Sequence, residues 1–186
     1  MPKQKITKEM IVDAAFSIAR TRGSDHVLVK NIAEELNCSV QPIYSYCENM
    51  EGLRQELIKK TASFFKQYIA EHIDKSNYFR GVGNAYISLA KEEPHLYRLY
   101  FMRIRKDIHS LNDIYEKECN PQVAAYIAES LHISPQKARA FHMNMLIYTQ
   151  GIALILASSG SDINAEEISA QLEQAYLAFE KQALQP

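Results

Sequence analysis

Apolar residues recur along this chain at intervals of three and four positions, a spacing that places them on one face of an α-helix. Between positions 7 and 22, such a face would be formed by Met10, Ile11, Ala14, Ala15, Ile18 and Ala19. The alternation of apolar and polar residues that indicates a β-strand is hard to find. The sequence therefore predicts an all-α protein.

Capping residues and prolines predict where the helices begin and end. Thr7 suits the N-cap of a first helix, and Gly23 suits its end because glycine readily adopts the conformation that closes a helix. Pro94, Pro121 and Pro135 fit the first turns of later helices. The predicted helices cover residues 7–22, 29–36, 40–46, 51–73, 77–91, a short stretch from 94, a stretch from 121, residues 135–158 and a last stretch from about 164.

The segment 29–46, VKNIAEELNCSVQPIYSY, has the pattern of two short helices joined by a tight turn. Ile43 would face inward, and Asn37 suits the turn because asparagine tolerates the left-handed conformation. We expect Ser39 to cap the second helix and Pro42 to occupy its third position, where a proline is tolerated. This pattern is typical of a helix-turn-helix, although a plain helical hairpin would have similar spacing.

The outer side of the second short helix would face base pairs if it entered a major groove of DNA. Gln41 is suited to read adenine through its amide, and the tyrosine hydroxyls nearby are suited to bond phosphate oxygens. The residues expected to contact DNA are Lys30, Ser39, Val40, Gln41, Pro42, Tyr44 and Tyr46. Lys3, Lys5 and Lys8 would either reach phosphates as well or form a solvated tail.

Charge and cysteine content limit the kinds of binding site that we expect in this chain. The 186 residues carry a net charge of −1, and residues 1–60 hold nine lysines and arginines against eight aspartates and glutamates. DNA binding would therefore rest on a local surface, not on bulk charge. Cys38, Cys47 and Cys119 form no CxxC motif, and the histidines are not paired at metal-binding spacing. We expect no disulfide framework, no metal site and no cofactor.

We expect a cytoplasmic protein that does not contact a membrane. The odd number of thiols suits a reducing compartment, and the opening MPKQKITKEM lacks the apolar core of a signal peptide. The most apolar run, residues 145–157, is shorter than the roughly 20 residues that span a bilayer. We interpret it as part of a buried helix.

An apolar first helix ending at Gly23 is followed by Ile32-Ala33, Ser39, Ile43-Tyr44, Tyr46 and Leu53. In this order and spacing, residues 11–53 resemble the TetR family of transcription regulators. The resemblance implies a three-helix helix-turn-helix DNA-binding domain at 1–50, joined through a long helix to a helical effector-binding and dimerisation domain at 51–186. It further implies a repressor that binds a palindromic operator on double-stranded DNA as a homodimer and is released by a small molecule.

Four residues depart from the family's pattern. Leu28 replaces a threonine that caps the helix and contacts phosphate, and Met50 replaces a lysine that reaches phosphate. Asn37 stands in place of the turn glycine, and Cys47 in place of a buried phenylalanine. A protein-interaction module with a degenerate helix-turn-helix is therefore an alternative. An enzyme is disfavoured because the sequence has no Glu-x-x-His pair, nucleophile elbow or phosphate loop.

The last two predicted helices are expected to form the dimer interface. Residues 135–158 are apolar nearly all round, with Phe141, Met145, Tyr148, Ile152 and Ile155 on one face. One side would face its own domain and another side the partner subunit, with a fully central core helix as the alternative. An apolar or aromatic effector would contact residues that are also typical of a core, namely Tyr86, Phe101, Met102, Tyr115, His142, Met145 and Tyr148.

Overall fold

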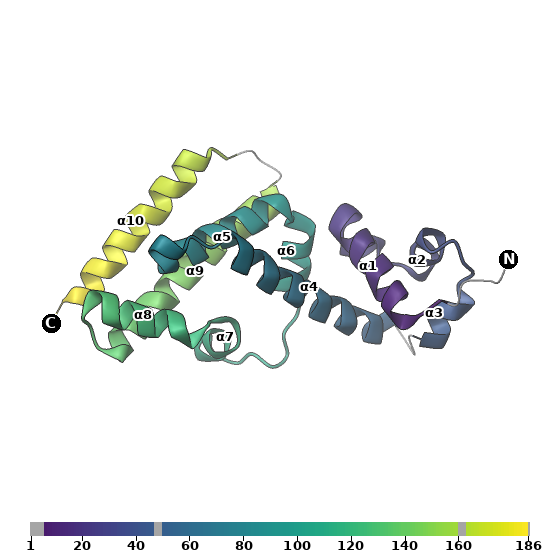
Figure 1. Ribbon diagram of the computed structural model, residues 1–186, viewed down its shortest axis with the longest axis horizontal. Coiled ribbons are helices and arrows are strands. Elements are labelled where there is room, and N and C mark those ends of the chain that lie inside the picture. The colour runs from purple at the N-terminus through teal and green to yellow at the C-terminus, as the bar shows by residue number, and fades with distance from the viewer. Residues whose placement is uncertain (1–5, 47–49, 160–162, 186) are drawn as a thin grey trace. The chain divides into compact units, whose positions relative to one another are not determined.

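The computed structural model describes residues 6–46, 50–159 and 163–185 of the chain, and every regular element in these ranges is a helix (Figure 1). The elements are α1 (Lys8–Arg22), η1 (Ser24–His26), α2 (Val29–Glu35), α3 (Gln41–Tyr46), α4 (Met50–His72), η2 (Lys75–Asn77), α5 (Tyr78–Glu92), α6 (Pro94–Phe101), α7 (Leu111–Glu118), α8 (Pro121–Leu131), α9 (Pro135–Ser159) and α10 (Ala165–Leu184). The predicted all-α class is confirmed.

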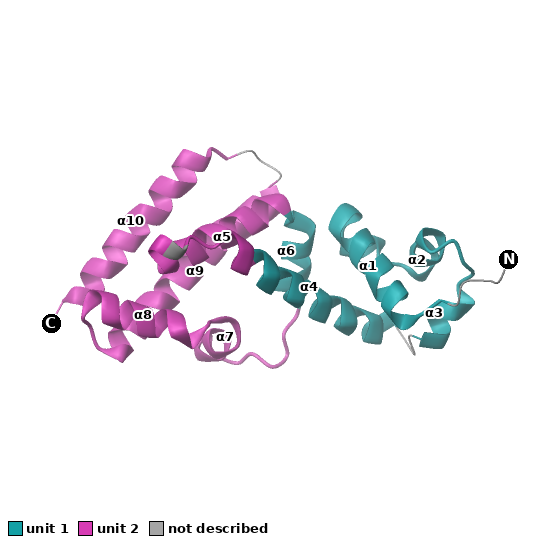
Figure 2. Ribbon diagram, in the orientation of Figure 1, with its two compact units in different colours: residues 1–68, 93–103 teal, residues 69–92, 104–186 magenta. Residues whose placement is uncertain are grey.

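The helices gather into two compact units (Figure 2). Unit 1 contains residues 1–68 together with residues 93–103, and unit 2 contains residues 69–92 and 104–186. Helix α4 runs from one unit into the other, and α6 belongs to unit 1 although it follows α5 of unit 2. The boundary predicted at residue 50 separates an expected DNA-binding domain from an expected effector-binding and dimerisation domain. This division by function stays a prediction.

The core of unit 1 forms around α1, which packs against α2, α3 and α6. The inward side of α1 is fully buried at Ile11, Ala15 and Ile18, as its spacing predicts. Thr7 caps the helix by accepting a hydrogen bond of 3.2 Å from the Met10 N–H. Gly23 ends the helix with a φ of 93°, a conformation that glycine adopts without strain.

Helix α6 is joined to the rest of unit 1 by aromatic packing and by one ion pair. The ring of Phe65 on α4 stacks on Phe101, with centroids 5.9 Å apart, and also contacts Tyr97 and Tyr100. The Nε–H of Arg20 on α1 donates to both carboxylate oxygens of Glu93, at 2.9 Å each, directly before α6. Glu93 is only 7% exposed, so the carboxylate end of this ion pair is buried in the unit.

Unit 2 is built around α9, which packs against α5, α8 and α10. Its buried core consists of Phe79, Val123, Ile127, Ala138, Phe141, Met145, Ala175 and Ala183. By length and composition α9 meets the criterion for a membrane-spanning helix, as does the core helix of many soluble proteins. In this structure its inner side is covered by the other helices of unit 2.

The outer faces of α9 and α10 keep large apolar side chains at the surface. Ile147 and Ile155 on α9 are 49% and 57% exposed, and Leu177 and Leu184 on α10 are exposed to a similar degree. Gly151 lies midway between the two isoleucines, and a Cβ built on it would meet nothing within 4 Å. Ile155 was predicted to share the face of Phe141, but it points outward while Phe141 is buried, so that detail was wrong.

Candidate DNA-binding surface

The pair α2–α3 has the backbone of a helix-turn-helix. Ile32 and Ile43 are buried, which fixes one side of each helix in the core of unit 1. Asn37 adopts a φ of 48°, in the left-handed region predicted for it. The turn is closed by two backbone hydrogen bonds, from the Asn37 N–H to Glu34 and from the Cys38 N–H to the carbonyl of Ala33.

Helix α3 begins one residue later than predicted. The carbonyl of Val40 accepts hydrogen bonds from the N–H groups of Ile43 at 3.2 Å and Tyr44 at 3.3 Å, so Val40 takes the N-cap position predicted for Ser39. Pro42 consequently occupies the second helical position, not the third. The proline is tolerated there for the same reason, because an N–H in the first turn has no partner within the helix.

The side chains predicted to read DNA lie on the outer side of α3. Val40 is 43% exposed and Tyr44 is 63% exposed, and Gln41 and Tyr46 are exposed as well. Pro42 is half-buried, and Ser39 lies at the surface before the helix. The first turn of α3 therefore presents one amide side chain, Gln41, next to apolar atoms of Val40.

The lysines predicted to contact phosphate face carboxylates in this structure. Lys30 Nζ lies 3.8 Å from Glu34, one turn further along α2, and Lys8 Nζ lies 3.3 Å from Glu56 on α4. These pairs are solvent-exposed or nearly so, and such pairs contribute little to stability. Each lysine could therefore turn from its carboxylate to a phosphate at small cost. Lys3, Lys5 and Cys47 lie outside the described residues.

Two further apolar residues are exposed, one directly before α2 and one at the start of α4. Leu28, directly before α2, is 54% exposed, and it makes no side-chain cap for that helix. Met50, the first residue of α4, is also exposed. With Val40, Tyr44 and Tyr46 they form a set that we call the apolar reading surface. Two of the five residues in this set, Leu28 and Met50, are positions at which the sequence departs from the family's pattern.

The residues predicted to contact an effector are divided between the two units. Phe101 and Met102 belong to unit 1, where Phe101 packs on Phe65 and Met102 is exposed. The remaining five belong to unit 2, namely Tyr86, Tyr115, His142, Met145 and Tyr148. Met145 is part of the buried core, and the hydroxyl of Tyr148 donates to Gln171 at 3.2 Å.

Two of these residues are brought together in the interior of unit 2. The hydroxyl of Tyr115 and Nδ1 of His142 are 2.8 Å apart, within hydrogen-bonding distance. Burial, together with the smaller effect of the nearby charge of Arg139, lowers the pKa of His142 to about 4. Burial raises the pKa of Tyr115 to about 12. Both side chains are therefore neutral near pH 7, as a polar pair in a core requires.

The fold is shared by solved proteins. A TetR variant from Acinetobacter baumannii AYE, solved in complex with minocycline, matches 97% of this chain and 100% of its own length, with a TM-score of 0.63 at 14% sequence identity. The chain has the fold of TetR-family regulators. A TetR-family transcriptional regulator from Haemophilus influenzae RD matches 91% of this TetR-like chain and 94% of its own, with a TM-score of 0.58 at 16% identity.

Sequence comparison gives a likeness over part of the chain. The TetR-like chain is 23% identical over 106 residues to YobS, an uncharacterized HTH-type transcriptional regulator of Bacillus subtilis (strain 168). The match covers 55% of this chain and only 56% of that protein's length. No family model matches the chain. The resemblance inferred from residues 11–53 thus agrees with the fold found for the whole chain.

Proposed function

We propose that this TetR-like protein is a DNA-binding transcriptional regulator. The observation that carries the proposal is the pair α2–α3, in which Ile32 and Ile43 are buried while Val40, Gln41 and Tyr44 are exposed on the outer side. A short helix held in this way can enter the major groove with its first residues against base edges. Gln41 would pair with adenine, and Tyr44 and Tyr46 would bond phosphates.

The proposal includes a homodimer that binds a palindromic operator and acts as a repressor. Two reading helices must lie about 34–36 Å apart to enter successive major grooves, so a change in the direction of α4 would weaken binding. A small molecule that prefers one arrangement by a few kcal/mol is sufficient for such control. The TetR variant from Acinetobacter baumannii was solved with minocycline, which supports a small-molecule effector for this chain too.

Selection of bound DNA from a random pool tests the proposal directly. We expect recovery of a palindromic site whose half-sites are about one helical turn apart. Gln41→Ala should weaken binding to that site by about tenfold and leave binding to unrelated DNA unchanged, because the amide reads a base. Lys30→Gln should weaken both alike and reduce the slope of log affinity against log salt by about one.

Two observations together would contradict DNA binding. If selection recovers no preferred site, and at low salt the protein binds unrelated DNA no better than an acidic control protein does, the DNA-binding proposal is wrong.

A protein-interaction module is the second candidate function. It is favoured by the apolar reading surface and by the pairing of Lys8 and Lys30 with carboxylates, because both reduce attraction to phosphate. Capture of a second regulator, together with absent DNA binding, would support it.

A further inference from the structure

Helix α3 presents an exposed arc in which one amide lies beside apolar side chains. A helix advances by about 100° per residue, so Val40, Tyr44 and Gln41 fall within roughly 100° of one another around the start of α3. All three are exposed, whereas Ile43 is buried in the core of unit 1. Because Ile43 holds the inner side of the helix, this arc is the part of α3 that a major groove would meet.

The arc carries no cationic side chain that would read guanine. Arginine and lysine are the commonest readers of guanine, and residues 37–46 include neither of them. The hydroxyl of Ser45, which is also exposed, donates to the Gln41 carbonyl at 3.0 Å, so its proton is used within α3. With the Tyr44 hydroxyl proposed to bond a phosphate, the groups that remain for bases are the amide of Gln41 and the methyl groups of Val40.

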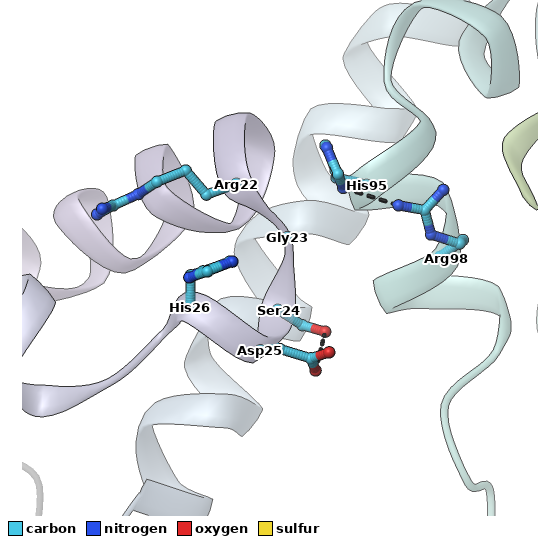
Figure 3. A pocket seen from close by; sticks show the side chains of 7 residues that line it. All are labelled: Arg22, Gly23, Ser24, Asp25, His26, His95 and Arg98. Carbon is cyan, nitrogen blue, oxygen red and sulfur yellow. Dashed lines mark hydrogen bonds between the residues drawn. The ribbon is translucent and has the colours of Figure 1, made fainter. Parts of the chain in front are cut away.

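Basic side chains of unit 1 gather on other elements. Figure 3 shows a pocket at the end of α1 and on η1 and α6, whose lining includes Arg22, His26, His95 and Arg98. Nη2 of Arg98 lies 2.8 Å from Nδ1 of His95, so these two side chains are engaged with each other. The basic groups at this pocket belong to elements other than α3, which has to select bases through one amide and apolar contact.

The position of Val40 is fixed by its backbone, which leaves its side chain available for contact. Its carbonyl accepts the N–H groups of Ile43 at 3.2 Å and Tyr44 at 3.3 Å, while its side chain is 43% exposed. Against adenine, guanine or cytosine, the valine would cover a polar group of the base edge without offering it a hydrogen bond, which is unfavourable. Thymine is the base that presents a methyl group in the major groove, so it suits Val40 best.

We propose that Val40 selects a thymine by contact with its 5-methyl group, in a base pair next to the adenine read by Gln41. The inference rests on the proposed function and names the base step that the reading surface takes. It gives an apolar side chain a role in base selection, although such side chains add nothing to the attraction for phosphate. Each half-site of the operator is therefore expected to contain A·T pairs at two neighbouring positions.

Removal of single methyl groups from the operator tests the proposal without changing the protein. In the site recovered by selection, each thymine is replaced in turn by 2′-deoxyuridine in both half-sites, which removes the 5-methyl group and keeps the base pairing. At the position that Val40 contacts, the affinity should fall by about fourfold for each methyl group removed. A C·G pair at that position should likewise bind more tightly with 5-methylcytosine than with cytosine.

Two protein variants assign the methyl contact to Val40. Val40→Ala keeps the backbone carbonyl that caps α3 and should reduce the preference for thymine over uracil towards one. Leu28→Ala is the matched control, because Leu28 is also exposed and apolar but lies directly before α2. This control should keep the preference at the same position. A preference that is unchanged in Val40→Ala would belong to another residue and would overturn the proposal.

The outcomes separate the thymine contact from the proposed function. Equal affinity for thymine and uracil at every position, or a selected site without thymine, would overturn the thymine contact and leave DNA binding intact. A protein that selects no site and binds no DNA would overturn the proposed function, and this inference with it. A preference for thymine that is lost in Val40→Ala and kept in Leu28→Ala would support both.

Discussion

His142 lies in a position that disfavours its charged form. It is buried between α5 and α7, with the rings of Phe79 and Tyr115 against it at centroid distances of 5.6 and 5.2 Å. Burial lowers its pKa to about 4, from an ordinary value of 6.5. The unfolded chain therefore binds a proton at a higher pH than the folded chain does, which links stability to pH.

We predict that the free energy of unfolding decreases as the pH falls from about 6.5 towards 4. Over that window the unfolded state binds more protons at this residue, so stability increases with pH and is lost on acidification. The loss should approach about 3 kcal/mol at the lower end. Urea unfolding across this range measures it, and His142→Gln should flatten the curve relative to His132→Gln, an exposed histidine. A curve unchanged by His142→Gln would contradict the assignment.

Local side-chain chemistry was predictable at the residue scale, and distant partners were not. Thr7 and Asn37 act as predicted because a cap and a left-handed turn depend on the nearest few residues. The start of α3 was misplaced by one position because Ser39 and Val40 both precede a plausible first turn. The hydrogen bond between Tyr115 and His142 joins residues 27 positions apart, and no local pattern indicates it.

Helix α6 is attached to α1 through an ion pair whose two ends have different surroundings. The side chain of Glu93 is 9% exposed, whereas that of Arg20 is 48% exposed. The hydrogen bonds that Arg20 donates to Glu93 raise the pKa of the guanidinium above its ordinary value. Removing the arginine would leave a buried charge without its partner, while removing the carboxylate would leave an arginine that water can solvate.

We predict that Arg20→Gln destabilises the fold more than Glu93→Gln does. The first change should cost about 3 kcal/mol because the carboxylate remains buried, and the second about 1 kcal/mol because a hydrogen bond from the guanidinium to an uncharged amide replaces the ion pair. Chemical denaturation near pH 7 compares the two, with Lys66→Gln as the control for loss of an exposed charge. Equal costs would mean that Glu93 is reached by water in solution.

Helix starts were easier to predict than the assignment of helices to units. Prolines mark the first residues of α6, α8 and α9 because their fixed φ suits a first turn. The short helix α7 was missed, although Ser110 caps it by accepting a hydrogen bond from the Asp113 N–H. The placement of α6 in unit 1 depends on Glu93, which lies 73 positions from Arg20, so it could not be predicted from local spacing.

At the scale of the whole molecule, α9 and α10 carry four of the large apolar side chains that unit 2 leaves exposed. Ile147, Ile155, Leu177 and Leu184 remain exposed after the helices have packed on each other. Large apolar side chains that stay exposed on neighbouring helices are typical of an interaction surface when they form one patch. A two-fold arrangement would cover it with the same two helices of a second copy, as the proposed homodimer requires.

We predict that Ile155→Glu converts the dimer to a monomer, because it places a charge inside the proposed interface. Light scattering coupled to size-exclusion chromatography measures the mass in solution. Ile104→Glu is the matched control, since Ile104 is 91% exposed and lies outside α9 and α10. Dimers in both variants would show that another surface holds the subunits together.

A methyl group added at Gly151 should have opposite effects on the single chain and on the dimer. It should stabilise the helix within one chain and weaken the association of two chains. Within one chain the space beside it is open, so Gly151→Ala should stabilise α9 by about 1 kcal/mol through helix propensity alone. Against a second α9, the same methyl would separate two backbones that glycine lets approach. We predict a variant whose melting temperature is higher than the parent's in dilute solution and no longer increases with protein concentration. Melting curves over a dilution series measure both effects, and a concentration dependence equal to the parent's would place Gly151 outside the interface. In this way a residue without a side chain would set how closely two subunits associate.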